Sequence, residues 1–82
     1  MPTNRAVKIT YRLGGICDGK RYVYTELPEF ATLAAALKYQ ATRPGRNTYD
    51  VLLEEIPCVT NGVHWGTRCV LRSALDGQVL PT

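Results

Sequence analysis

Apolar and polar side chains alternate from Val7 to Leu13, and this period of two is typical of a half-buried strand. Asp18-Gly19 then predicts a tight hairpin turn, because Gly adopts a positive φ freely and Asp tolerates one. A two-residue loop at this point predicts the following rungs between two strands: Cys17 with Lys20, Ile16 with Arg21, Leu13 with Tyr24, and Arg12 with Thr25.

This register gives the first hairpin two unlike faces. The apolar and aromatic face carries Val7, Ile9, Tyr11, Leu13, Tyr22 and Tyr24. The basic face carries Lys8, Thr10, Arg12, Arg21, Val23 and Thr25. A longer loop or a bulge at Gly14-Gly15 would exchange the two faces of one strand, so the assignment depends on the register.

Residues 30–42 carry the helical pattern of the chain, with apolar residues three and four positions apart at Phe30, Leu33, Ala34, Leu37 and Ala41. Thr32 is the expected N-cap, because its hydroxyl can accept a hydrogen bond from a free N–H of the first turn. Pro44-Gly45 ends the helix. We expect the apolar stripe to pack on a sheet, since so short a helix is not stable alone.

Asn61-Gly62 is a strong hairpin signal, and it joins two expected strands, Tyr49–Val59 and Val63–Ser73. A two-residue loop predicts the rungs Cys58 with Trp65, Pro57 with Gly66, Glu55 with Arg68, Leu53 with Val70, and Leu52 with Leu71. The Glu55–Arg68 rung would be a favourable cross-strand charge pair.

The faces of this second hairpin are less regular than those of the first. Val51, Leu53 and Val70 fall on the side expected to be exposed, and Glu54 falls on the side expected to be buried. A bulge near Pro57 would resolve the conflict.

The order of these elements predicts an α+β fold. Asp76-Gly77 offers a third turn, after which Gln78–Leu80 would return as a short fifth strand. We expect one domain over residues 1–82, in the order ββαββ, with an antiparallel four- to five-stranded sheet and one helix packed on one face. Neither hairpin can bury its apolar side alone, and 82 residues support a single small core.

The chain is mildly basic, with ten Lys and Arg against seven Asp and Glu, a net charge of +3 and a pI near 8.9. Most of the cations are arginine, whose planar guanidinium suits carboxylates and phosphates. The expected partner-binding residues lie on the open sheet face and in two exposed turns: Lys8, Arg12, Lys20, Arg21, Arg43, Arg46, Asn47, Arg68 and Arg72. The alternative is that these side chains only keep the protein in solution.

Cys17, Cys58 and Cys69 form an odd set without C-x-x-C spacing, and the N-terminus has no secretory signal pattern. We therefore expect free thiols and a cytoplasmic protein. No stretch approaches the ~20 apolar residues of a membrane helix, so no membrane association is expected.

Few residues have the spacing that catalysis or metal binding needs. His64 lies close in sequence to Cys58, but the predicted register puts them on opposite faces, which argues against a Cys-His dyad or a zinc site. Glu54-Glu55 likewise point to opposite faces of a strand. Tyr22–Tyr24 would suit a base-stacking platform, yet the register turns both tyrosines toward the core. We expect no enzyme activity, no cofactor and no metal.

The chain resembles small phage-encoded proteins, among them the anti-CRISPR inhibitors. The resemblance lies in the size, the hairpin-helix-hairpin layout and the stretch from Phe30 through Ala34 into Thr48–Leu52. It is architectural, spans most of the chain and carries over no functional residue. It implies a non-enzymatic protein that occludes a nucleic-acid or partner site on a host complex. Some such proteins are acidic mimics of DNA, and a net charge of +3 departs from that pattern.

We therefore expect a protein-binding module, an inhibitor of the phage type that occludes a site on a host nucleoprotein complex through an Arg-rich surface, in the host cytoplasm. The alternative function is a small basic nucleic-acid-binding domain that contacts phosphates. The chain is expected to be a monomer or a weak homodimer, in which Val7–Leu13 or Gln78–Leu80 would supply the pairing edge.

Overall fold

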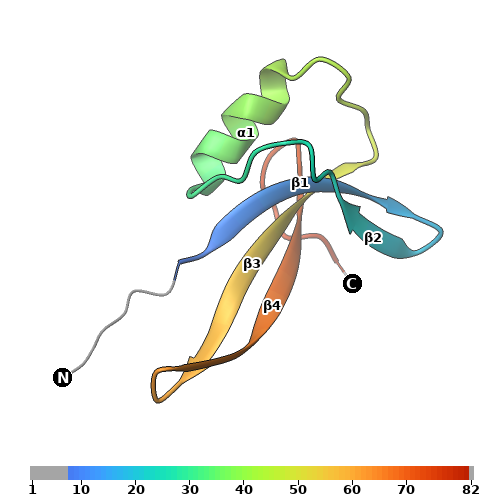
Figure 1. The fold of residues 1–82 in the computed structure, drawn as a ribbon. Helices are drawn as coiled ribbons and strands as arrows, with labels where there is room; N and C mark the ends of the chain where they lie inside the picture. The colour runs from blue at the N-terminus through green and yellow to red at the C-terminus, as the bar shows by residue number, and fades with distance from the viewer. Residues whose placement is uncertain (1–7, 82) are drawn as a thin grey trace.

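The computed structural model describes residues 8–81 and contains four strands and one helix. In chain order these elements are β1 (Thr10–Cys17), β2 (Lys20–Val23), α1 (Leu33–Thr42), β3 (Asp50–Thr60) and β4 (Val63–Ser73). The strands form one antiparallel sheet in the order β2-β1-β3-β4, and α1 lies over one side of it (Figure 1). An α+β fold with an antiparallel sheet is thus confirmed; Val7, at the start of the predicted first strand, lies outside the described residues.

The first hairpin has the predicted turn. Asp18 and Gly19 have φ values of 53° and 76°, and the rungs at Cys17–Lys20 and Ile16–Arg21 form as expected. The Arg12–Thr25 rung does not form, because β2 ends at Val23 and the chain turns away. Tyr11 pairs with Phe30 instead, through two backbone hydrogen bonds of 2.8 and 2.9 Å.

Gly14 and Gly15 lie inside β1 and take no part in the turn. A Cβ on Gly14 would lie 2.1 Å from the backbone oxygen of Tyr22 and 2.9 Å from Cδ1 of Leu53. A Cβ on Gly15 would lie 2.9 Å from the hydroxyl of Tyr24. These glycines therefore allow neighbouring groups to lie close against β1, and neither the longer loop nor the bulge considered at this pair forms.

Helix α1 begins after Thr32, whose Oγ1 accepts a hydrogen bond from the N–H of Ala35 at 3.2 Å, so the predicted N-cap is confirmed. The predicted apolar stripe is wrong in part, because Ala34 and Ala41 are exposed. The face that the helix turns to the sheet keeps the predicted Leu33 and Leu37 and adds Ala36 and Gln40. These positions keep the helical spacing of three and four residues, since they share one face.

The core lies between α1 and one face of the sheet. Its fully buried members are Leu13, Ala36 and Leu52, and Ala74 closes it from the segment after β4. Partly buried side chains surround this cluster: Tyr11, Tyr24, Leu27, Phe30, Leu33, Leu37 and Tyr39. Tyr22 shares the face of Tyr24 by register but is 48% exposed, so the expectation that both tyrosines are core residues holds for Tyr24 alone.

The second hairpin turns at Asn61-Gly62 as predicted, but its register differs. A β-bulge on β4 between the Val59–His64 and Cys58–Gly66 rungs leaves Trp65 as the extra residue. Every rung below the bulge is shifted by one residue from the prediction. The predicted Glu55–Arg68 pair is therefore wrong: Glu55 lies opposite Cys69, and Arg68 lies opposite Ile56.

Both faces of the first half of β3 are buried. Leu52 faces α1, while Val51 and Leu53 face the other side and are only 6% and 2% exposed. The sheet curls into a half-barrel that covers this second face. The curl brings its two edge strands, β2 and β4, toward each other, so that the charge of Arg21 on β2 acts on the pKa of Cys69 on β4. The prediction of a fully open, basic second face is wrong here, because the curl converts its centre into a small apolar layer.

The end of the chain folds back after Gly77, which has a φ of 79°. Val79 forms an isolated bridge with Arg72, and the N–H of Leu80 donates to the carbonyl of Leu71 at 3.0 Å. The expected return of this segment is present, but as a single bridge rather than as a fifth strand.

Pro57 marks the place where the sheet narrows to two strands. In the described chain, the β1–β3 ladder ends at the Thr10–Glu55 rung. Pro57 is the next residue of β3 that would face β1, and it has no N–H to donate. Beyond this point the β3–β4 hairpin projects from the body on the side away from α1 (Figure 1), and the molecule measures 46 × 26 × 23 Å.

Candidate interaction surfaces

Asp50, at the start of β3, is a buried carboxylate surrounded by donors. Its oxygens accept hydrogen bonds from the hydroxyl of Tyr24 at 2.8 Å, from Gln40 at 2.7 Å and from the N–H of Asn47 at 2.9 Å. Arg43 completes the set with an ion pair of 2.5 Å, and its guanidinium lies 5.5 Å from the ring centre of Tyr24. Arg43 and Asn47, both predicted to bind a partner, therefore hold the loop before β3 against the sheet.

Burial alone would raise the pKa of Asp50. The hydrogen bonds from Asn47, Gln40 and Tyr24, together with the charge of Arg43, outweigh burial and hold this pKa below its ordinary value. The pKa of Tyr24 is raised to about 12 by burial, by its hydrogen bond to Asp50 and by the charge of that carboxylate. Both shifts favour a neutral phenol that donates to an ionised carboxylate.

Glu54, four residues further along β3, forms a second site of the same kind. It accepts a hydrogen bond of 2.7 Å from the hydroxyl of Tyr11 and pairs with Arg72 at 3.2 Å. The hydrogen bond to Glu54, followed by burial, raises the pKa of Tyr11. Arg72 also donates to the carbonyl of Gly77 at 2.7 Å, so it ties the C-terminal turn to the sheet. Arg72 is therefore another predicted partner-binding residue that has a structural role.

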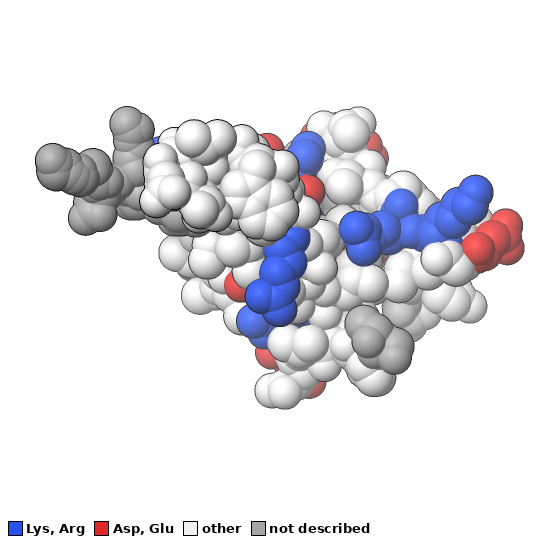
Figure 2. All heavy atoms as spheres, turned by 90° about the horizontal axis from the view of Figure 1, so that it is seen from below, with Lys and Arg blue, Asp and Glu red and all other residues white. Residues whose placement is uncertain are grey.

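The remaining predicted partner-binding residues differ in whether their side chains are already bonded within the chain. Arg12 pairs with Glu29 at 3.8 Å on the surface, and Arg46 donates to the carbonyl of Ala41. The exposed cations without an ion pair among the described residues are Lys8, Lys20, Arg21, Lys38, Arg46 and Arg68. Figure 2 views the molecule from the side away from α1, and there the Lys and Arg atoms form separate groups with uncharged surface between them. The structure does not bring the nine predicted residues together on one surface.

The two most exposed of the large apolar side chains of the sheet lie near the end of the β3–β4 hairpin. Trp65 is 67% exposed and Val63 is 62% exposed, and Val59 is also exposed on the opposite face. The indole N–H of Trp65 donates to Oγ1 of Thr60 at 3.0 Å, which places Trp65 and Val63 on the same face. We define the distal hairpin surface by Val63, Trp65 and Arg68. The bulge predicted near Pro57 is confirmed between Cys58 and Val59, but the sequence does not show that Trp65 is its extra residue, so this surface did not stand out there.

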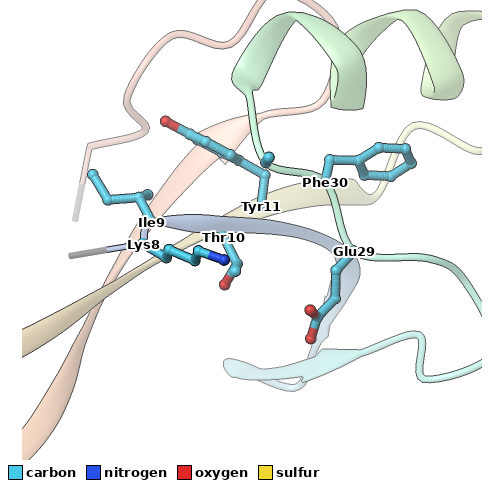
Figure 3. A pocket seen from close by; sticks show the side chains of 7 residues that line it. Lys8, Ile9, Thr10, Tyr11, Glu29 and Phe30 are labelled. Atoms are coloured by element: carbon cyan, nitrogen blue, oxygen red, sulfur yellow. The ribbon is translucent and has the colours of Figure 1, made fainter. Parts of the chain in front are cut away.

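Two grooves lie elsewhere on the described surface. One, of about 590 Å³, lies between the start of β1 and residues 29–31; its ionisable lining groups are Lys8, Tyr11 and Glu29. Figure 3 shows Lys8, Thr10 and Glu29 on one side of β1 and Tyr11 and Phe30 on the side of α1. The other groove, of about 370 Å³, lies between α1 and the loop 46–48. In the first groove, Tyr11 is already bonded to Glu54, so its hydroxyl is not free to act on a ligand.

The cysteines and the histidine do not form a catalytic pair or a metal site within the described residues. Cys58 and His64 belong to adjacent rungs and so point to opposite faces. Burial raises the pKa of the Cys69 thiol, and all three cysteines are free. Within residues 8–81, no group of three or more His, Cys, Asp and Glu side chains could hold a metal ion.

The fold and these surfaces define a small α+β protein with a curled antiparallel sheet and a projecting hairpin. No known protein family, curated protein or solved structure matches the chain. Over the described part of the chain, the single helix is too short to cross a membrane.

Proposed function

We propose that the chain is a small, non-enzymatic protein-binding module that engages its partner through the distal hairpin surface. The observation that carries this proposal is the 67% exposure of Trp65 at the end of a two-stranded arm, beside the exposed Val63 and Arg68. Exposed tryptophan and arginine are the residues that most often dominate protein interfaces. The bulge and the Thr60 hydrogen bond fix the indole before binding, which lowers the ordering cost.

This proposal moves the binding surface from the one that the sequence predicts. Arg68 remains in it, and Lys20 and Arg21 on the first hairpin would be a second contact. Arg43, Asn47 and Arg72 are left out, because they are bonded to Asp50, Glu54 and Gly77. As an inhibitor of the phage type, the protein would insert the hairpin into a site of a host nucleoprotein complex; three free thiols suit the reducing host cytoplasm.

The test is capture of a partner by the tagged chain from nuclease-treated bacterial lysate. We expect Trp65→Ala to lose at least 90% of a discrete captured protein, about tenfold, as interface tryptophans do. Tyr49→Ala is the matched control, since Tyr49 is a 76% exposed aromatic outside the hairpin. Equal capture by wild type and Trp65→Ala would contradict the proposal.

The alternative function is nucleic-acid binding, and the exposed cations without ion pairs are the observation that favours it. Fluorescence anisotropy with labelled duplex and single-stranded DNA at low and moderate salt decides between the two. Binding to phosphates would weaken steeply with salt, with a slope of about −0.9 per contact on duplex DNA. Under the protein-binding proposal we expect no measurable binding at moderate salt.

A further inference from the structure

Most strand edges of the described sheet are closed. β1 pairs with β2 and β3, and Phe30 covers it at Tyr11, so it is not the pairing edge that the sequence predicts. β2 is short and carries Lys20 and Arg21, which discourage pairing. The C-terminal segment covers β4 at Leu71 and Ser73. Among the described residues, the stretch of β4 from His64 to Val70 has no neighbour on its outer side.

The hydrogen bonds of β4 show which groups face outward along this stretch. Leu71 accepts from Leu80, and Ser73 donates to Gln78, so both residues turn their backbone groups to the outer edge. Alternate residues of a strand face the same way, so Thr67 and Cys69 also face outward. Beyond the bulge, the Thr60–Val63 rung closes the turn, which leaves His64 facing outward.

The side chains of this open edge suit a strand of the same sequence. The stretch His64–Val70 contains no Lys, Asp, Glu or Pro and one Arg, so it lacks the residues that natural edge strands use against pairing. When two copies run antiparallel with His64 opposite Thr67 of the second copy, Arg68 lies opposite Val63 and diagonal to Trp65. The cation of each copy then meets an indole rather than the other cation.

We infer that two copies of this chain pair along the outer edge of β4, which joins their sheets into one. The register also fits the space that is open, because each Asn61-Gly62 turn ends beside Cys69, before the position that Leu80 covers. The interface is short, and the bulge twists the edge, so the dimer exchanges with monomer at micromolar concentrations. This inference does not rest on the proposed function, although both use Trp65 and Arg68, so dimerisation and capture are measured in the same variants.

Sedimentation velocity of the full chain over about a hundredfold range of concentration tests the pairing. The key variant is Thr67→Pro, which removes an N–H that faces the outer edge of β4. Thr67 lies opposite Pro57, and its N–H points away from β3, so the β3–β4 ladder loses no hydrogen bond. Thr67→Ala keeps the N–H and is the matched control. We expect wild type and Thr67→Ala to dimerise and Thr67→Pro to stay monomeric.

Other outcomes overturn the inference. A wild type that stays monomeric at the highest concentration overturns it, as does a folded Thr67→Pro variant that dimerises like wild type. If circular dichroism shows that Thr67→Pro is unfolded, Trp65→Ser replaces it, with at least tenfold weaker dimerisation expected and unchanged dimerisation overturning the pairing. A monomeric wild type whose capture of another protein is lost in Thr67→Pro assigns the edge to that protein instead. Capture that survives in a monomeric Thr67→Pro leaves the proposed function intact.

Discussion

At the scale of single residues, the sequence predicts features that depend only on neighbouring positions. The turn residues Asp18 and Asn61 take positive φ values, and Thr32 caps α1, because each needs only a few adjacent residues. The roles of Arg43 and Asp50 were not predictable in this way. Their ion pair depends on how the loop after α1 packs against the sheet, which no local pattern encodes.

The Asp50 site gives a prediction for stability. Asp50→Asn would leave the guanidinium of Arg43, whose side chain is 11% exposed, without its anion. We expect the free energy of unfolding to fall by about 3 kcal/mol, since breaking a buried pair strands the remaining charge. Urea unfolding measures this loss, and Glu26→Gln, at an exposed position, is the control. A loss no larger than that of the control would contradict the role of Asp50.

Tyr24 gives a prediction for alkaline pH. Its pKa of about 12 lies above the ordinary value of 10.0, so the folded chain favours the neutral phenol. The resulting stability is complete below about pH 10 and is lost as the pH rises toward 12. The urea midpoint of wild type should therefore fall more steeply over this range than that of Tyr24→Phe. Tyr49→Phe, at an exposed tyrosine, should follow wild type; identical profiles for wild type and Tyr24→Phe would refute this.

At the scale of elements, the sequence pattern predicts that the hairpins and the helix exist, but it does not predict which of their side chains face the core. The second hairpin has the predicted turn, yet one extra residue at Trp65 moves every later rung. A bulge costs little locally and is chosen by which side chains the whole sheet buries. The burial of Leu53 and Glu54 on opposite sides of β3 shows the result: the curl covers Leu53, while Glu54 is bonded to Tyr11 and Arg72 on the side of α1.

Gly14 tests how closely the strands approach. Gly14→Ala would place a methyl group 2.1 Å from the backbone oxygen of Tyr22, so β2 must shift away from β1. We expect a loss of about 1–3 kcal/mol in the free energy of unfolding, the usual effect of overpacking. Gly66→Ala is the control, because nothing lies within 4 Å of its added Cβ. Thermal unfolding compares the two, and equal melting temperatures would contradict the close approach.

At the scale of the whole molecule, the sequence predicts the number of cations but not where they lie on the folded surface. Among the residues predicted to bind a partner, Arg43 and Arg72 form internal ion pairs. The cations visible in Figure 2 form separate groups. Net charge predicts the total but not its distribution. The distal hairpin surface emerges only when the sheet curls in one place and narrows in another.

The division of the molecule into body and arm predicts uneven protection from hydrogen exchange. Backbone amides at residues 51–55 belong to a strand with neighbours on both sides and a core beneath it. Those at residues 58–66 belong to a two-stranded ribbon. Measured by NMR at concentrations that keep the chain monomeric, the bonded amides of the arm should exchange at least about tenfold faster. Equal protection in both regions would show that the arm is as stable as the body.

The two-stranded arm of β3 and β4 begins at Pro57, because this residue has no backbone N–H to donate to β1. The reach of the arm is therefore separable from the fold beneath it. Two further residues in each strand would lengthen the arm by about 7 Å and keep Trp65 on its present face, whereas a single added residue would turn the indole to the opposite face. The protein thus has a scaffold of fixed size from which the exposed Trp65 can be moved outward, on the same face, only in steps of two residues.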